Sequence, residues 1–160
     1  GRALGFNPEQ IYVNSVSATA AFLNIAVANA GAAYVNGSLS VAYLKDPANP
    51  QWNNDAAMKL YRQVMAKYAP SANANDGLYL YGVAKAETFV QALTAAGKNP
   101  TRASFQAALN RMNSVNRFAL PGVRQKTGPR DRFIISQMQL IRYQHPDWRL
   151  QGRLIEGRPR

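Results

Sequence analysis

A chain of 160 residues is long enough to bury a hydrophobic core, and 47% hydrophobic with 17% charged residues is typical of a globular protein rather than a disordered one. The absence of cysteine excludes disulfides and thiol catalysis, and no apolar run approaches the roughly 20 residues that span a bilayer. The net charge of +11 permits an anionic partner. The chain begins at Gly1 rather than at an initiator methionine, and we expect a mature or cut product.

The first 44 residues predict a βαβ unit. Ile11–Val13 has the composition of a short strand, and a polar loop follows over residues 14–17. Ser17 or Thr19 can cap the alanine-rich helix AAFLNIAVANA. We expect its core-facing residues to be Phe22, Ile25 and Ala26. Residues 37–44 are apolar, as buried parallel strands are, and α/β sheets place ligands at the loop after such a first strand.

Residues 45–76 predict a loop and a half-buried helix. Pro47 and Pro50 favour extended geometry over residues 45–53. A short polar side chain then caps a helix that Pro70 ends. The candidates for this cap are Asn53, Asn54 and Asp55, and the apolar face is expected to hold Ala57, Tyr61, Val64 and Tyr68.

Two more helices are predicted after Asp76. This residue caps a helix whose opening residues, 78–83, are apolar almost all round, so we expect them to be deeply buried. Gly97 and Pro100 end that helix. Thr101 caps the next helix, which carries Phe105, Ala108, Leu109 and Met112 on one face.

The last 43 residues have strand-like composition. Phe118–Lys126 predicts a strand interrupted by Pro121-Gly122, and Arg132–Gln144 predicts a second one with Phe133, Ile135 and Ile141 on one face. A hairpin at 145–147 then leads to Trp148–Leu150. The tail Ile155-Glu156-Gly157-Arg158 matches an engineered protease site. We interpret it as native sequence because it continues the local pattern.

Known catalytic and metal-binding patterns are missing from the sequence. One histidine, no cysteine and scattered acids do not make a metal site. The phosphate loop, the GxGxxG fingerprint and the GxSxG elbow are absent, and a Ser–His–Asp triad would have to use His145, which sits beside Pro146 in a turn. We therefore expect no enzyme and no cofactor.

The charge distribution bears on nucleic acid. Residues 1–100 hold seven Lys/Arg and five Asp/Glu, whereas residues 101–160 hold twelve and three. The basic residues are single arginines between other residues and accompany no known nucleic-acid motif, so a solvated basic surface is the preferred interpretation.

Two groups of residues could bind a small molecule. Asn14, Ser15 and Ser17 offer polar donors at a helix N-terminus, where a carboxylate is favoured, although plain helix capping is the alternative. Tyr79 and Tyr81 could line an apolar or aromatic ligand, or could be core residues with a bonded hydroxyl. Trp52 and Trp148 are interpreted as packing residues at loop edges.

The order of these features resembles the C-terminal half of a type I periplasmic binding protein, in the Leu/Ile/Val-binding family of branched-chain amino acid and amide transport. The matching segments are YLKDP at 43–47 with Asn49-Pro50, ALTAAGKNPTR at 92–102, LPG at 120–122, and QMQLIRY at 137–143 before Trp148. The resemblance implies an α/β fold, a three-layer sandwich of two lobes joined by hinge strands. Residues 1–38 would belong to the C-terminal lobe, 39–45 to a hinge crossing, 46–130 to the N-terminal lobe, and 131–160 to a second crossing and the return strands.

The resemblance also implies a function. It implies a periplasmic solute-binding protein of an ABC importer that closes its lobes on a small solute, with three partners: the solute, a membrane permease and the N-terminal half of the same receptor, but no nucleic acid. A ligand-sensing domain of a receptor or regulator with the same fold is the alternative, and a basic nucleic-acid-binding domain is a third hypothesis.

The family's pocket residues fall by motif on two segments of this chain. The pocket loop falls on Asn14, Ser15, Val16 and Ser17, and the second contact falls near Tyr81 and Val83. The chain departs from the family pattern twice. Val83 and Ala84 stand where a Tyr and an Asp commonly follow the Gly, and the pocket loop has no acid to pair an amino group. The implied ligand is therefore an amino acid, an amide, or a small aromatic or aliphatic carboxylate.

Overall fold

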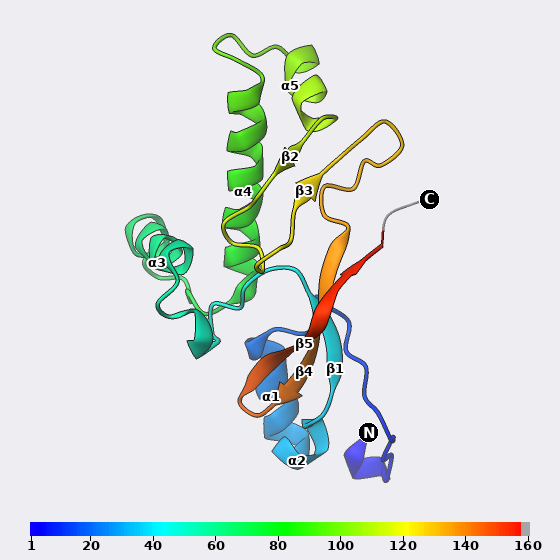
Figure 1. Ribbon diagram of the computed structural model, residues 1–160. Helices are drawn as coiled ribbons and strands as arrows, with labels where there is room; N and C mark the ends of the chain where they lie inside the picture. The colour runs from blue at the N-terminus through cyan, green and yellow to red at the C-terminus, as the bar shows by residue number, and fades with distance from the viewer. Residues whose placement is uncertain (158–160) are drawn as a thin grey trace.

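A computed structural model describes residues 1–157 and places helices at both ends of an antiparallel sheet (Figure 1). The helices are α1 (Ala20–Ala30), α2 (Ala32–Val35), α3 (Ala56–Tyr68), α4 (Gly77–Ala95) and α5 (Arg102–Leu109), with 3-10 turns at Arg2–Leu4 and Pro50–Trp52. The strands are β1 (Leu39–Ala42), β2 (Asn113–Ser114), β3 (Gln125–Lys126), β4 (Gln137–Gln144) and β5 (Asp147–Glu156). Among the described residues, none of the helices is long and apolar enough to cross a membrane.

The three-stranded sheet has the order β1-β4-β5, so β4 lies at its centre. β1 pairs antiparallel with β4, and Leu39 lies opposite Arg142. β5 pairs with β4 over its whole length, from Asp147 opposite Gln144 to Glu156 opposite Gln137. The predicted hairpin is therefore confirmed, and its second strand is longer than Trp148–Leu150. Ile155 and Glu156 of the tail belong to β5, whereas Arg158 lies outside the described residues.

Several predicted strands are shorter in the structure. Ile11–Val13 reduces to one parallel bridge between Tyr12 and Leu39. The strand predicted over residues 37–44 narrows to β1, whose main partner is antiparallel. Most of 118–126 is loop, because Pro121 offers no amide and Gly122 turns the chain with a φ of 86°. The pairing there is limited to β3 with β2 and to single antiparallel bridges from Ala119 to Leu44 and from Gln125 to Ile135. The strand predicted from Arg132 begins at Gln137, and Phe133 is largely exposed.

Helix α1 packs on the sheet through a different stripe from the one predicted. Thr19 caps it, accepting a hydrogen bond from the Phe22 amide at 3.5 Å, as expected. Leu23 is buried with Ile141, Tyr143 and Trp148, whereas Phe22 and Ile25 are 48% and 60% exposed. The predicted core face was right for Ala26 and wrong for Phe22 and Ile25, because the stripe that packs on the sheet consists of Leu23, Ala26, Val27 and Ala30.

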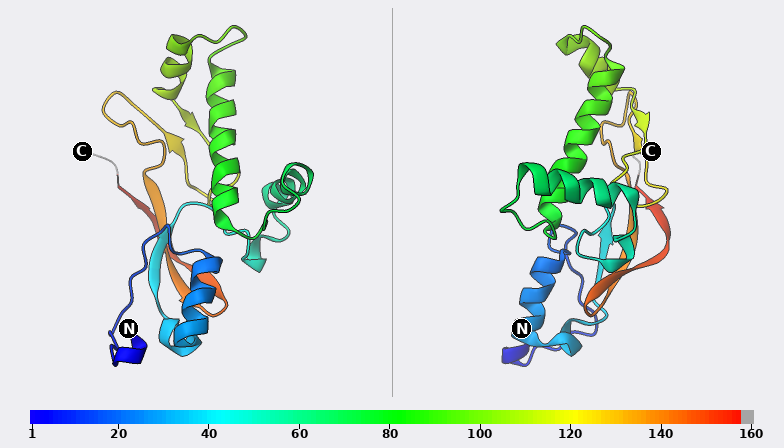
Figure 2. Two further views of the ribbon diagram at one scale, coloured as in Figure 1. Left: turned by 180° about the vertical axis from the view of Figure 1, so that it is seen from behind. Right: turned by 90° about the vertical axis from the view of Figure 1, so that its left-hand side faces the viewer.

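Helices α3 and α4 share the core at the other end of the sheet, where α3 crosses beside the lower half of α4 (Figure 2). Asp55 and Asp76 cap the two helices, accepting from Met58 at 3.0 Å and from Leu78 at 2.9 Å. The predicted caps are thus confirmed. The shared core contains Met58, Tyr61, Met65, Leu80 and Ala84.

Two burial predictions for these helices were wrong. Leu78 is 52% exposed and Tyr81 is 39% exposed, although the opening of α4 was expected to be deeply buried. Tyr68 at the end of α3 is exposed as well. An apolar helix buries only the faces that a neighbour covers, and α3 covers one face of α4.

The last helix, α5, begins with a capping box. Thr101 accepts from the Ser104 amide at 3.1 Å, and the Ser104 hydroxyl accepts from the Thr101 amide at 2.9 Å. The predicted cap is confirmed. Phe105 packs against Phe89 of α4 with ring centroids 5.2 Å apart, so α5 lies against the far half of α4.

Candidate functional site

A cavity of about 260 Å³ lies where three segments meet: the loop before α1, the chain that leaves β1, and the start of α4. Residues of strands β1, β4 and β5 also line it. The residues that line it are Ser15, Val16, Ala18, Thr19, Val41, Ala42, Tyr43, Leu44, Lys45, Asp46, Pro47, Asn49, Gln51, Trp52, Gly77, Leu78, Tyr81, Leu120, Ile141, Trp148 and Leu150. Most of them are apolar or aromatic, which is usual for a small-molecule site.

Three of the six predicted site residues share this cavity. Ser15 and Val16 line it from the loop, and Tyr81 lines it from the first turns of α4. The remaining three do not line it. Asn14 stabilises the loop instead, since its side-chain oxygen accepts from the Val16 amide at 2.9 Å and its carbonyl accepts from Ser17 at 2.9 Å. Val83 packs against the core between α3 and α4.

The N-termini of α1 and α4 meet at the cavity. Thr19 caps α1, Gly77 is the first residue of α4, and both line the cavity. A Cβ atom on Gly77 would lie 3.6 Å from Cγ2 of Thr19, which is ordinary van der Waals contact. Both helix dipoles therefore direct their positive ends towards the same space, which favours a negatively charged or hydrogen-bond-accepting group there.

Lys45, in the segment after β1, forms an ion pair with Asp55. Its ammonium donates to Oδ2 of Asp55 and to the carbonyl of Arg117, both at 2.8 Å, and the residue is buried. Burial alone would raise the pKa of Asp55, but the hydrogen bonds from Lys45 and from the Met58 amide lower this pKa overall. The ion pair thus anchors the exit of β1 to the start of α3.

Asp46 is the acid among the described residues that line the cavity. Its Oδ1 accepts from the Ala48 amide at 2.9 Å, and the salt bridges of the described residues do not include it. Burial raises its pKa, the Ala48 amide opposes this, and the nearby Asp147 adds to the increase. Burial also raises the pKa of the Tyr43 phenol in the same cavity, with a further contribution from Tyr81.

Residues of β5 and of the loop at 47–52 also line the cavity. Trp148 is only 4% exposed, and its ring packs edge-on against Tyr143 with centroids 5.4 Å apart. Its indole N–H has no hydrogen-bond partner among the described residues. The Asn49 amide donates to the Trp148 carbonyl at 2.8 Å, which fixes the loop to the strand.

Three cavity residues were not predicted from the sequence: Asp46, Asn49 and Trp148. Trp148 was interpreted as a packing residue, and the chain places it 99 residues after Asn49, its hydrogen-bond partner. For Asp46 a signal existed, since it is an acid directly after an apolar strand, at the strand end where ligands bind in α/β proteins.

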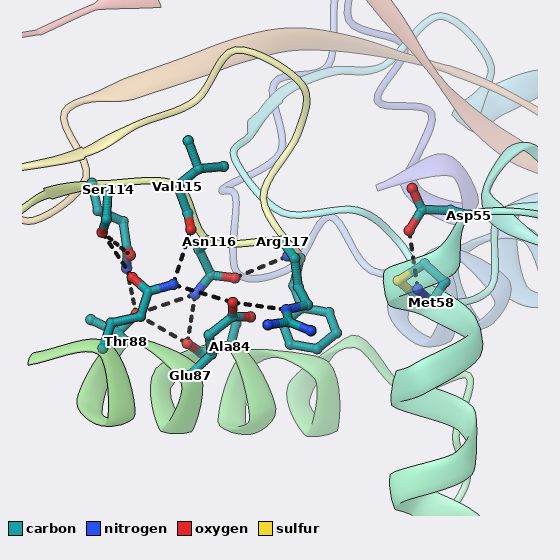
Figure 3. Close-up of polar contacts among 12 residues, drawn as sticks. Asp55, Met58, Ala84, Glu87, Thr88, Ser114, Val115, Asn116 and Arg117 are labelled. Carbon is teal, nitrogen blue, oxygen red and sulfur yellow. Dashed lines mark hydrogen bonds and ion pairs between the residues drawn. The ribbon is translucent and has the colours of Figure 1, made fainter. Parts of the chain in front are cut away.

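A polar network joins α4 to the chain at 114–117 (Figure 3). The Asn116 amide donates to the Ala84 carbonyl at 2.7 Å, and its oxygen accepts from the Phe118 amide at 3.0 Å. Nearby, Nε of Arg117 lies 2.9 Å from Oε1 of Glu87. Asn116 bonds to backbone groups on both sides, so we interpret the network as a device that holds α4 in place.

The single histidine, His145, makes two contacts that stabilise the fold. Its Nδ1 lies 3.0 Å from the Tyr143 hydroxyl, and its backbone amide donates to Oδ1 of Asn36 at 2.8 Å. Contacts with Tyr143 and Asn36 do not form a Ser–His–Asp triad.

A family profile described as periplasmic binding protein matches residues 1–147. The chain belongs to the periplasmic binding protein family. The resemblance stated from the sequence is thereby confirmed. A search of curated proteins found no match.

Several solved protein structures have the same fold as this chain. A branched-chain amino acid ABC transporter protein from Thermus thermophilus with bound valine matches with a TM-score of 0.74 and 13% identity, over 97% of this chain and 41% of its own. A possible leucine/isoleucine/valine-binding protein from Rhodopirellula baltica gives a TM-score of 0.67 and 20% identity, over 94% and 37%. An extracellular ligand-binding receptor from Rhodopseudomonas palustris gives 0.53 and 17%, over 94% and 43%.

These matches establish a type I periplasmic-binding-protein fold for the chain, as the sequence predicted. The chain spans only about two fifths of the length of these solved structures. It therefore has the ligand-binding fold of the family, in a segment shorter than the whole of these proteins.

Proposed function

We propose that this chain is the C-terminal half of a periplasmic solute-binding protein of an ABC importer, and that its solute binds in the cavity between α1, β1 and α4. The observation that carries the proposal is that Ser15 and Val16, on the predicted pocket loop, line the same cavity as Tyr81, on the predicted second contact. These segments are separated by more than 60 residues of chain. Such convergence on one apolar cavity is what a ligand site requires.

The cavity favours a small solute with an apolar body and a polar end. Val41, Leu120 and Leu150 supply apolar surface, and the N-termini of α1 and α4 supply positive dipole ends. An amino acid, an amide and a small aromatic or aliphatic carboxylate all have this form. The proposed binding of such a solute involves no bond chemistry.

The proposal includes the N-terminal half of the same receptor as a partner. A second hollow of about 430 Å³ runs along α4 and α5, and apolar side chains such as Phe89, Phe105 and Ile135 line it. Phe89 is 53% exposed there. An exposed apolar surface of this kind needs a cover, and the missing half supplies one.

Lobe closure is the proposed mechanism. Residues 1–38 belong to one lobe, 46–130 to the other, and the segments 39–45 and 131–160 contribute the crossings and the return strands. The cavity lies beside the exit of β1, so a rotation about the crossing strands would narrow it around the solute. The closed form would then be recognised by a membrane permease.

The test uses the full-length parent receptor and a panel of valine, leucine, phenylalanine, their amides and their deaminated carboxylates. Thermal shift followed by calorimetry should detect at least one ligand. Val16→Trp should abolish binding, because the indole would fill the cavity that Val16 lines. Val115→Trp is the matched control, since Val115 is exposed and lies outside the cavity lining. Failure of every compound to bind, or equal binding by both variants, would refute the proposed site.

A further inference from the structure

Five cations gather around the β2–β3 ribbon and the loop that follows it. They are Arg111, Arg124, Lys126, Arg130 and Arg132, all of them exposed, and we call this group the basic patch. The salt bridges of the described residues include none of these side chains. Five of the twelve basic residues in 101–160 therefore lie together, and the charge excess of this part of the chain is concentrated on one surface.

Asparagines, rather than acids, hold the guanidinium groups of the patch. Nη2 of Arg124 donates to Oδ1 of Asn113 in β2 at 2.9 Å. Nη1 of Arg132 lies 3.4 Å from Oδ1 of Asn110, the residue directly before Arg111. An amide oxygen accepts a hydrogen bond without neutralising the donor. These contacts thus keep the cations in place and leave their charge available to a partner.

The patch lies on the face of the ribbon that points away from the hollow along α4 and α5. Gln125 of β3 is buried and lines that hollow. Successive side chains of a strand point to opposite faces, so Arg124 and Lys126 point away from the hollow. A cover on the hollow therefore leaves the basic patch accessible.

The loop at 127–133 adds an exposed aromatic side chain to the patch. The amide of Gly128 donates to the Asp131 carbonyl at 2.8 Å and the reverse bond measures 3.2 Å, so Arg130 lies at the tip of a tight turn. The Asp131 carboxylate accepts from the amide of Phe133 at 3.0 Å. The Phe133 side chain is 71% exposed. In Figure 1 this loop extends away from α4, between β3 and β4.

We propose that the basic patch and Phe133 attach the receptor to a bilayer that contains anionic lipids. The cations would lie at the negatively charged headgroups, and the ring would insert at the boundary between headgroups and acyl chains. A single exposed ring among cations suits this surface better than a nucleic acid, whose successive bases stack on several aromatic side chains. The patch and Phe133 lie outside the solute cavity, so attachment is a second function and its failure would leave the proposed solute binding intact.

The first test is sedimentation of the full-length receptor with two kinds of vesicle: phosphatidylcholine alone, and equal parts of phosphatidylcholine and phosphatidylglycerol. The receptor should bind the anionic vesicles only, and this binding should fade as the salt concentration rises from about 0.05 to 0.5 M. Equal binding to both kinds of vesicle would overturn the proposal. Tighter binding to soluble polyglutamate or to an oligonucleotide than to the anionic vesicles would overturn it too, in favour of an acidic protein or a nucleic acid.

Two variants separate the contribution of the charges from that of the ring. Arg130→Gln/Arg132→Gln should weaken binding to the anionic vesicles roughly tenfold or more, because each cation near such a surface contributes about fivefold. Phe133→Ser should weaken binding severalfold and leave its salt dependence unchanged, because it removes apolar area and no charge. Unchanged binding by Phe133→Ser would overturn the role of the ring.

Lys59→Gln/Lys67→Gln is the matched control for the charge variant. It removes the same charge at two exposed positions of α3, outside the patch, and should bind the vesicles like the wild type. Equal weakening by the control and by Arg130→Gln/Arg132→Gln would show that net charge alone decides, and would refute the patch as the attachment surface.

Discussion

The ammonium of Lys45 lies 2.8 Å from Oδ2 of Asp55, while Oδ1 of the same carboxylate accepts from the Met58 amide at 3.0 Å. Asp55 therefore neutralises a buried cation and caps α3 at once. The pair connects the segment that leaves β1 to the first helix beyond it, next to the cavity.

Substitution of Asp55 can separate its two roles, because Asn is as good a helix cap as Asp. Asp55→Asn should destabilise the protein by about 1–3 kcal/mol, because the buried Lys45 loses its counterion but keeps its hydrogen bond to the Arg117 carbonyl. Asp55→Ala should cost about 1 kcal/mol more, since the cap is lost as well. Urea denaturation of the three proteins measures both steps. If Asp55→Asn is as stable as the wild type, the ion pair contributes nothing.

The same pair predicts a pH dependence. The folded-state pKa of Asp55 is lowered, so its stabilising contribution is complete above the unfolded-state pKa of about 3.9 and is lost as the pH falls through the folded value. The stability difference between the wild type and Asp55→Asn should be constant near neutral pH and shrink below about pH 4. A difference that persists unchanged at low pH would contradict this assignment.

Short-range features of the fold could be predicted, whereas burial and the site walls could not. The helix caps depend on a few neighbouring residues. Asp76 and Thr101 were predicted as caps, and Thr19 and Asp55 were each among the predicted candidates. The exposure of Phe22 depends on where the sheet touches α1. This requires knowledge of distant segments.

The site shows the same division. The loop at 14–17 and the start of α4 were indicated by motif, but the wall formed by Asn49 and Trp148 depends on the pairing of β4 with β5 and on the loop after β1. Contacts between residues about a hundred positions apart leave no local pattern in a single sequence.

Gly77 offers a test of the contact between the two helix N-termini. Its Cβ would meet only the Thr19 methyl, at 3.6 Å, so Gly77→Ala fits and should stabilise the protein by about 0.4–1 kcal/mol through reduced freedom of the unfolded chain. Ligand binding should be retained. Gly77→Phe should reduce binding, because Gly77 lines the cavity. Denaturation and calorimetry on the same samples test both effects, and destabilisation by Gly77→Ala would show that the helices approach more closely.

Asn116 should be important for the position of α4. Asn116→Asp keeps the shape but replaces the amide that donates to the Ala84 carbonyl at 2.7 Å with an acceptor. We expect a loss of about 1–3 kcal/mol, because a buried carbonyl loses its donor. The neighbouring Val115→Thr, at an exposed position, should be nearly neutral. Equal thermal stabilities for the two variants would argue against the network of Figure 3 as an anchor.

Tyr61 should tolerate the loss of its hydroxyl. The residue is fully buried between α3 and α4, its hydroxyl has no partner among the described residues, and burial raises its pKa to about 12. Tyr61→Phe removes an unsatisfied polar atom and should leave stability unchanged or raise it by up to about 1 kcal/mol. A marked loss of stability on denaturation would reveal a hydrogen bond to that hydroxyl.

The proposal that residues 46–130 belong to a lobe completed by an N-terminal half of the receptor can be tested at Phe89. Phe89→Gln should destabilise the full-length receptor by about 1–3 kcal/mol. In the full-length receptor the N-terminal half is proposed to cover the hollow along α4 and α5, so the substitution would remove a buried apolar side chain. Val90→Gln is the control, since Val90 is similarly exposed but does not line that hollow. Differential scanning calorimetry compares them. Equal effects of the two changes would contradict the proposed cover.

Helix α4 begins at the cavity and carries α5 at its far end (Figure 1). With nineteen residues it is about 28 Å long. If the proposed lobe closure pivots at the first turn of α4, a rotation of about 10° moves the cavity wall by about an ångström or less but moves the end that carries α5 by about 5 Å. Under that proposal, a small contraction of the cavity around a solute becomes a displacement at α5 that a partner protein would recognise.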